Sequence, residues 1–275
     1  MPIPPNDPKL LQQLHALWEA KPWTRPRPCG LSSSMGYGDR LGLATPGHIR
    51  AHCRVGLEAR VTPLFAQQSG REMERIGRSP AAVMLDAARA AEEADYRHPW
   101  GADADHMKSE EQIAACLEAG FTFFTLDPSA LIREEAEGWS EERVRSAYVE
   151  LVRSESSRYQ GFVERHSALD REGIHGPVGL ARETPQALAR ESLLAPEEVQ
   201  TALMRIALVY GAAVHRVAEL YNFLMSRWTD PVPFDLEVSV DETSTPTTPL
   251  AHRVIARELA RLGVRITSLA PRFVG

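Results

Sequence analysis

Four side chains that can do chemistry lie within six residues of one another, at Asp103, Asp105, His106 and Lys108. On an extended backbone Asp103 and Asp105 point to the same side, because successive side chains alternate. Two carboxylates, an imidazole and an ammonium group can hold a divalent metal ion or carry acid–base chemistry. The same residue types also suit a polar strand-to-helix turn with Asp and His as caps, so this stretch by itself leaves both interpretations open.

The composition is that of an ordinary globular chain, with 275 residues, 43% hydrophobic and 25% charged. The net charge of −6 gives no indication of nucleic acid or an anionic membrane as a partner. The chain has no apolar run of the roughly 20 residues that a membrane helix needs, and its N-terminus lacks the regions of a signal peptide. Three widely spaced cysteines, Cys29, Cys53 and Cys116, indicate reduced thiols in a cytoplasmic protein.

Six short stretches with strand character alternate with helix signals. The expected strands cover residues 29–35, 61–66, 100–107, 121–126, 234–240 and 264–269. Helix starts are indicated by Ser79-Pro80 and Thr248-Pro249, with Pro at the first helical position, and by Thr45-Pro46, with Thr45 as the N-cap. Ser109 and Gln112 form a capping-box pattern. This βα rhythm predicts a parallel α/β sheet.

The chain divides into four expected parts. In order they are an N-terminal arm, the first βα units, a helical insertion or lid, and further βα units, at residues 1–28, 29–129, 130–230 and 231–275. The insertion carries His166, His175 and His215, none of which has an acidic or basic group placed to assist it. We therefore expect these to be surface or packed histidines rather than ligands.

Polar or charged residues follow each expected strand. They are, in chain order, Asp39, Arg40, Gln67, Gln68, Asp103, Asp105, His106, Lys108, Asp127, Asp241, Glu242 and Arg272. The carboxyl ends of parallel strands share one face of a sheet, and active sites are built there. A structural role explains any one of these ends but explains the whole set poorly, so the pattern predicts a functional site at this face.

His106 and Glu242 are the best candidates for metal ligands, because they follow separate strands, as a divalent site with open positions requires. The three aspartates Asp103, Asp105 and Asp241 are second choices, as ligands or as groups that orient a ligand histidine.

Cations at the same face suit a negatively charged substrate. Lys108 and Arg272 can bind a carboxylate or an enolate-like oxygen, although an ion pair with a neighbouring acid explains Arg272 equally well. The glycine-rich turn 36–42 lets backbone N–H groups approach an anion, with Arg40 adding charge. The glycine spacing does not fit the dinucleotide fingerprint, and no catalytic triad, phosphate loop or kinase signature is visible.

Longer motifs carry a resemblance to a known family. They are Gly38-Asp39-Arg40-Leu41-Gly42-Leu43-Ala44-Thr45-Pro46-Gly47-His48, Phe65-Ala66-Gln67-Gln68-Ser69, Gly101-Ala102-Asp103-Ala104-Asp105-His106, Phe121-Thr122-Phe123-Phe124-Thr125, Ser239-Val240-Asp241-Glu242-Thr243 and Ser268-Leu269-Ala270-Pro271-Arg272-Phe273-Val274-Gly275. In order and character they resemble the tagaturonate epimerase family. The resemblance implies a metal-dependent enzyme of hexuronate breakdown that interconverts tagaturonate and fructuronate at C4, on a TIM-barrel-like (β/α) scaffold.

The resemblance also implies roles for individual residues. The metal ion, of the Mn²⁺, Ni²⁺ or Zn²⁺ kind, would be held by His106 and Glu242. The expected catalytic groups are Asp103, Asp105, Lys108 and Asp241, and the expected substrate-binding groups are Arg40, Gln67, Gln68, Asp127 and Arg272. We expect a small hexuronate as the substrate, and neither nucleic acid nor a membrane as a partner.

Carbon 4 is β to the ketone of a 2-keto hexuronate, so its bond to carbon 3 is an aldol bond. Retro-aldol cleavage, rotation of the aldehyde fragment and re-addition would therefore invert C4. The competing route, a transient oxidation at C4, needs a nicotinamide, and the sequence offers no site for one.

Family members are considerably longer than this chain, and six βα units are fewer than the eight of a closed barrel. We therefore expect an incomplete barrel with little activity by itself, completed by a C-terminal complementing fragment or by a homo-oligomer. Two alternatives stay open: a metal-dependent ketose isomerase or aldolase acting on a related sugar, and an inactive truncated fragment that needs a partner chain.

Overall fold

The computed structural model describes residues 3–167 and 196–274, which divide into two compact units. Residues 1–127, 219–239 and 265–269 form the first unit, and residues 128–218, 240–264 and 270–275 form the second. His175, which was expected to be a surface or packed histidine, lies outside the described residues.

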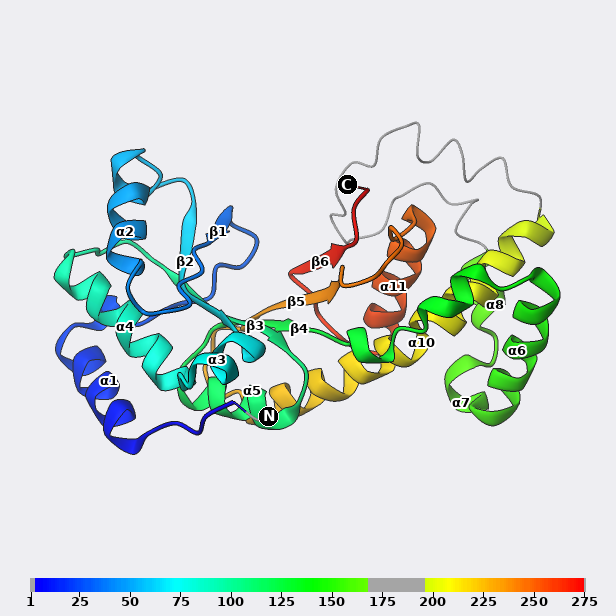
Figure 1. Cartoon of the computed structure of the whole chain (residues 1–275), viewed down its shortest axis with the longest axis horizontal. Helices are drawn as coiled ribbons and strands as arrows, with labels where there is room; N and C mark the ends of the chain where they lie inside the picture. The colour runs from blue at the N-terminus through cyan, green and yellow to red at the C-terminus, as the bar shows by residue number, and fades with distance from the viewer. Residues whose placement is uncertain (1–2, 168–195, 275) are drawn as a thin grey trace. The chain divides into compact units, whose positions relative to one another are not determined.

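The first unit is built on a sheet of parallel strands in the order β1-β2-β3-β4-β5-β6. The strands cover β1 (Ser34–Gly36), β2 (Thr62–Ser69), β3 (Gly101–Met107), β4 (Phe123–Leu126), β5 (Asp235–Val240) and β6 (Ser268–Pro271). Sequential strands are neighbours throughout, so the six strands form a curled half-barrel (Figure 1), and the expected incomplete TIM-barrel-like scaffold is confirmed.

Helices of the first unit cover one face of this sheet. They are α1 (Pro8–Ala20), the 3₁₀ turn η1 (Pro22–Thr24), α2 (Thr45–Arg54), α3 (Gly70–Ile76), α4 (Pro80–Glu93) and α5 (Glu110–Glu118). The first unit also contains the C-terminal part of α10, from residue 219 onwards. Phe65 of β2 is buried on the helix side, where its ring centroid lies 5.2 Å from that of Tyr96 and 6.0 Å from that of Trp100. Such aromatic packing supplies much of the apolar burial that holds helices on a sheet.

The second unit is helical apart from strand ends. It contains the 3₁₀ turns η2 (Ser129–Leu131) and η3 (Glu134–Gly138), the helices α6 (Glu141–Ser154), α7 (Ser156–Tyr159), α8 (Phe162–Ser167) and α11 (Pro249–Arg261), and the first part of α10 (Pro196–Arg227). Arg205 of α10 ties η3 down, because its guanidinium donates to the carbonyl oxygens of Ala136, Glu137 and Trp139.

A buried carboxylate organises the α8–α11 contact within the second unit. Glu258 is 4% exposed and accepts from His166 Nε2 at 2.9 Å and from Arg261 Nη2 at 2.7 Å. Burial alone would raise the pKa of Glu258, but the bonds from His166 and Arg261 outweigh it and hold this pKa at about 2. His166 is packed, as expected, but the expectation that no acidic group lies beside it was wrong.

Replacing Glu258 by alanine should lower the free energy of unfolding by about 2–4 kcal/mol, because it leaves His166 and Arg261 without their shared carboxylate. The lost contribution is present above the ordinary glutamate pKa of 4.5 and disappears as the pH falls towards 2, since the folded-state pKa is lowered. Urea unfolding at pH 7 and pH 3 measures this, with exposed Glu142→Ala as the control. An equal loss of stability at both pH values would contradict the account.

Most helix starts follow the sequence signals. Ser79, Ser109 and Thr248 are N-caps whose side chains accept from the backbone N–H three residues later. The capping box expected at Ser109 is only half formed, because the Gln112 side chain accepts from the N–H of Lys108. Thr45 is not an N-cap: Ala44 holds that position, and the Thr45 hydroxyl donates to Asp39 instead.

Two strand predictions were displaced. Residues 29–33 precede β1 as a turn rather than a strand, because the N–H groups of Cys29 and Gly30 donate to the buried carboxylate of Asp235. The last strand begins at Ser268 rather than at 264, since the N–H of Val264 still bonds to Leu259 at the end of α11. The helix α3 was not anticipated.

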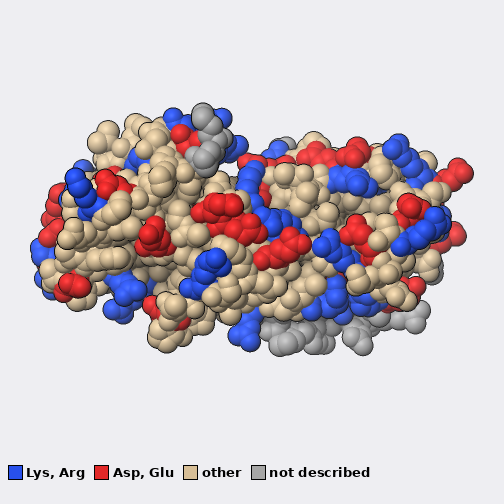
Figure 2. Space-filling view, turned by 90° about the horizontal axis from the view of Figure 1, so that it is seen from below, with Lys and Arg blue, Asp and Glu red and all other residues tan. Residues whose placement is uncertain are grey.

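The surface and the cysteines agree with the composition. On the face shown in Figure 2, Lys and Arg side chains are interspersed with Asp and Glu side chains. Cys29, Cys53 and Cys116 are free thiols, as expected. Among the described helices, none combines the length and apolar character that crossing a bilayer requires.

Candidate active site

The sheet face opposite the helices is polar and open. The strand register places Gln67 beside Asp103, and Thr125 beside Glu237, so their side chains project from this same face. Together with residues from the ends of β1 and β6, Gln67, Asp103, Asp105 and Glu237 line a hollow of about 410 Å³. A volume in the range of roughly 300–1,000 Å³ suits a small-molecule ligand.

Asp103 lies at the floor of this hollow and is 3% exposed. Gln67 Nε2 donates to its Oδ2 at 2.9 Å, and Thr125 Oγ1 donates to its Oδ1 at 3.1 Å. Burial, reinforced by the neighbouring charge of Asp105, raises the pKa of Asp103 well above its ordinary value. A carboxyl group with a raised pKa can act as a general acid near neutral pH.

A β-bulge at the end of β3 sets the backbone conformation of His106. The pairing of β3 with β4 shifts between Ala104 and Met107, so β3 carries one extra residue there. His106 within the bulge has φ of +52°, a left-handed conformation that residues other than glycine rarely adopt. Strain of this kind persists where the surrounding structure fixes it and is frequent at functional sites.

His106, Asp127 and Lys108 form a compact cluster at the ends of β3 and β4. Asp127 is 2% exposed, and its Oδ2 lies 3.0 Å from His106 Nδ1 and 3.0 Å from Lys108 Nζ. The other ring nitrogen, Nε2 of His106, lies 3.9 Å from Oδ1 of Asp105. A carboxylate on Nδ1 fixes the imidazole so that Nε2 can serve as a ligand or a base.

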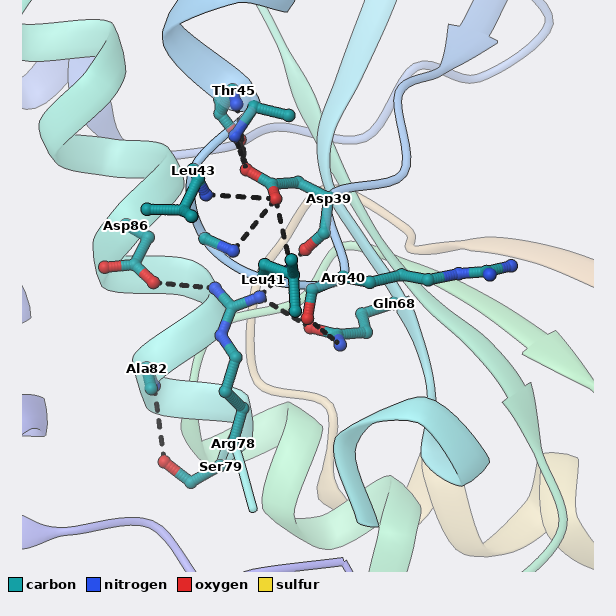
Figure 3. Close-up of polar contacts among 12 residues, drawn as sticks. Asp39, Arg40, Leu41, Leu43, Thr45, Gln68, Arg78, Ser79, Ala82 and Asp86 are labelled. Carbon is teal, nitrogen blue, oxygen red and sulfur yellow. Dashed lines mark hydrogen bonds and ion pairs between the residues drawn. The ribbon is translucent and has the colours of Figure 1, made fainter. Parts of the chain in front are cut away.

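A second hollow, of about 580 Å³, opens beside the first and shares Gln67 and Asp105 with it. The loop after β1 supplies Arg40, whose side chain is 75% exposed and forms an ion pair with Glu72. Figure 3 shows the Arg40 side chain directed away from the polar contacts of its own loop.

Gln67 and Gln68 lie on opposite faces of the sheet, because they are adjacent in β2. Gln68 is 1% exposed, and its amide is engaged by the carbonyl oxygen of Arg40 and by the guanidinium of Arg78.

Three of the predicted site residues, Asp241, Glu242 and Arg272, belong to the second unit. Asp241 and Glu242 directly follow β5, and Glu242 is exposed. Arg272 follows β6, where its N–H donates to Thr247 Oγ1 at 3.0 Å. Within the first unit the structure brings most of the candidates to one face and leaves Gln68 on the other, whereas Asp241, Glu242 and Arg272 are described only within the second unit.

Sequence reasoning missed two residues of the polar face, Thr125 and Glu237. Thr125 binds Asp103, and Glu237 accepts from Ser268 Oγ at 2.6 Å. The signal was present in β5, where Asp235, Glu237 and Ser239 alternate with apolar residues, although a strand buried on both faces would be continuously apolar.

A family profile and a similar protein both match most of this chain. The profile of the tagaturonate epimerase family matches residues 7–175 and 191–275. A tagaturonate/fructuronate epimerase of Thermotoga maritima is 37% identical over 264 residues, covering 96% of this chain and 48% of its own length.

Solved structures of a fructuronate-tagaturonate epimerase from Cohnella laeviribosi are also similar. The form complexed with one glycerol is 34% identical with a TM-score of 0.76, and the native form is 33% identical with a TM-score of 0.74. Each comparison covers 96% of this chain and 49% of the solved chain. The chain thus spans about half the length of the relatives that it matches.

Proposed function

We propose, from the premise that this chain belongs to the tagaturonate epimerase family, that the protein it contributes to interconverts D-tagaturonate and D-fructuronate by inverting C4. The observation that supports the proposal is the His106–Asp127–Lys108 cluster at the ends of β3 and β4, the same two strands that carry buried Asp103 and its partner Thr125. This arrangement combines a potential ligand, an acid–base group and a cation within reach of one small molecule.

The donor set suits a divalent ion. With Nδ1 of His106 held by Asp127, its Nε2 is oriented for a metal, and the carboxylate of Asp105 lies on the same side. We assign Glu242 as the second ligand from its place directly after β5, the strand that pairs with β4. A bound Mn²⁺, Ni²⁺ or Zn²⁺ would polarise the substrate ketone and stabilise negative charge on oxygen.

The protein groups supply the proton transfers of a retro-aldol route. A base takes the proton of the C4 hydroxyl, the C3–C4 bond breaks to leave an aldehyde at C4 and an enolate at C3, and re-addition to the other aldehyde face returns the proton. Asp105 and Asp241 are our candidates for the base. Asp103, whose pKa burial raises, can remain protonated and donate a hydrogen bond to developing negative charge, while Lys108 adds positive charge beside it.

Substrate contacts follow from the same face. Gln67 and Arg40 line the hollows, and we assign them to sugar hydroxyls and the carboxylate respectively; Arg272 is a further cation candidate after β6. The paired and buried Asp127 is better suited to orienting His106 and Lys108 than to touching the sugar. Residues 130–230, of which 168–195 lie outside the described residues, are proposed as a helical insertion or lid, and a cytoplasmic location stays a prediction.

The half-length coverage supports one addition, namely that full turnover needs the rest of the barrel. Further sequence beyond these 275 residues, a separate partner chain or a second copy would supply it.

Binding by the chain itself tests the proposal. We expect D-tagaturonate to bind in the presence of Mn²⁺ at least about tenfold more tightly than neutral D-tagatose, because a charge-assisted contact to the carboxylate contributes about 1.4 kcal/mol or more. Isothermal titration with Mn²⁺, Ni²⁺, Zn²⁺ or a chelator measures this. Tighter binding of the neutral ketohexose would favour a ketose isomerase or aldolase instead, and ion-independent binding would remove the metal from the proposal.

A further inference from the structure

The loop after β1 already contains an anion, its own Asp39 carboxylate. Oδ1 and Oδ2 of Asp39 accept from the backbone N–H groups of the five following residues Leu41–Thr45, at 2.8–3.3 Å, and Oδ2 also accepts from the Thr45 hydroxyl at 2.8 Å. The cradle that the glycine-rich sequence suggested for an external anion is therefore filled internally. Its N–H groups hold the loop rather than a ligand.

This carboxylate stays ionised across the working pH range. Asp39 is 7% exposed, and burial alone would raise its pKa, but the bonds from Thr45, Ala44 and Leu43 outweigh burial and lower the pKa to about 2. It also lies at the start of α2, where the helix dipole favours a negative charge.

Arg78 fixes the same loop from outside (Figure 3). Its Nη1 donates to the carbonyl oxygen of Asp39 at 2.8 Å and to Gln68 Oε1 at 2.9 Å, and its Nη2 pairs with Asp86 Oδ2 at 2.6 Å. Gln68 in turn donates to the carbonyl oxygen of Arg40 at 3.1 Å. Two consecutive backbone carbonyls, those of Asp39 and Arg40, are thus anchored to β2 and α4.

Gly42 shows how tightly this region is built. It has φ of +75°, and a Cβ there would lie 2.5 Å from Asp86 Oδ2 and 3.0 Å from Arg78 Nη2. Only glycine fits both the left-handed backbone and the close approach of the Arg78–Asp86 pair.

The loop held by these hydrogen bonds carries the side chain of Arg40. The carbonyl oxygens of Asp39 and Arg40 are both hydrogen-bonded. The Arg40 guanidinium points away from these bonds (Figure 3) and lines the same hollow as Gln67, Glu72 and Asp105. A planar, exposed guanidinium on a fixed backbone is suited to recognising a carboxylate, and the Arg40 guanidinium already pairs with one in the structure, that of Glu72.

We propose that Asp39 and Arg78 are positioning residues that hold Arg40 where it receives the carboxylate of the uronate substrate. The proposal rests on the proposed function. In the retro-aldol route the carboxylate belongs to the aldehyde fragment, which must rotate and re-add without leaving. A fixed Arg40 retains that fragment, and Arg78 and Asp39 act only through Arg40.

The test compares uronate and neutral-sugar binding by the folded chain. Titrations with D-tagaturonate and D-tagatose, both with Mn²⁺, are run on the wild type, Arg40→Gln, Arg78→Met and the exposed control Arg75→Met. We expect Arg40→Gln and Arg78→Met each to reduce the tagaturonate-over-tagatose preference about tenfold, with tagatose affinity unchanged within about twofold. Arg75→Met should retain the full preference, and amide exchange of residues 41–44 should accelerate only in Arg78→Met.

The outcomes separate the two proposals. An Arg78→Met chain that keeps the wild-type preference, or that loses affinity for both sugars equally, overturns the positioning role and leaves the proposed function standing. A wild type that binds both sugars equally overturns both. If Arg78→Met does not fold, Asp86→Asn is the second variant. It removes the negative charge that pairs with Arg78, at a side chain that is 41% exposed. A reduced tagaturonate-over-tagatose preference in Asp86→Asn then supports the proposal, and an unchanged preference overturns it.

Discussion

Replacing His106 by asparagine is expected to weaken divalent-ion binding by the chain by about 100-fold, because it removes the imidazole Nε2 that Asp127 orients. Asparagine is the better replacement, since it tolerates the left-handed backbone at φ of +52° that alanine would strain. The variant should therefore stay folded while losing the ion. Titration with Mn²⁺ and Zn²⁺, together with the Mn²⁺ electron paramagnetic resonance signal, measures the affinity.

The matched control is His98→Asn, a histidine that is exposed and follows α4. It should bind the ions as the wild type does. A His106→Asn chain with wild-type ion affinity would show that the β3 bulge does not hold the ion, and the cluster would then be confined to acid–base and structural roles.

Between pH 4 and pH 8, a chain with Asp103→Asn should lose less of its free energy of unfolding than the wild type loses. Burial raises the pKa of Asp103 in the folded state, so its contribution to stability is fully present below the ordinary carboxyl pKa of about 4 and is lost as the pH rises through the raised value. Asparagine carries no proton to lose and can still accept from Thr125, so the variant escapes that loss.

Thermal unfolding between pH 4 and pH 8 measures the effect, with exposed Glu93→Gln as the control. In an enzyme with the complete barrel, the same Asp103→Asn change should reduce turnover by about 10²- to 10⁴-fold, the usual value of a positioned acid or base. Identical pH dependence in wild type and variant would show that folding does not raise the pKa of Asp103, and would remove it as the proton donor.

Local sequence signals predicted helices correctly where the residues at a helix start include both an N-cap and a proline. Ser79-Pro80 and Thr248-Pro249 begin helices as expected, because each combines a capping hydroxyl with a preset φ. The first strand was misplaced because Asp235, more than 200 residues away, takes the N–H groups of Cys29 and Gly30. Long-range bonds of this kind leave no local trace.

The candidate site shows the same division. The Asp103–Lys108 cluster was visible from residue types, but the bulge that turns His106 towards Asp127 depends on the pairing of β3 with β4. Alternation alone would have separated Gln67 from Gln68, since neighbours in a strand face opposite ways. The role of Arg78 could not be anticipated, because its partners lie in three different elements of the chain.

The most direct test of C4 epimerisation is turnover by a fusion of residues 1–275 with the part of the Thermotoga maritima relative that this chain does not match. ¹H nuclear magnetic resonance follows D-tagaturonate with Mn²⁺ present or chelated, for the fusion, its His106→Asn variant and the chain alone. We predict ion-dependent formation of D-fructuronate by the fusion, a loss of about 10³-fold in His106→Asn, and little conversion by the chain alone. A folded fusion that binds the ion and tagaturonate but forms no fructuronate, or one that keeps its rate without the ion and without His106, would contradict the account.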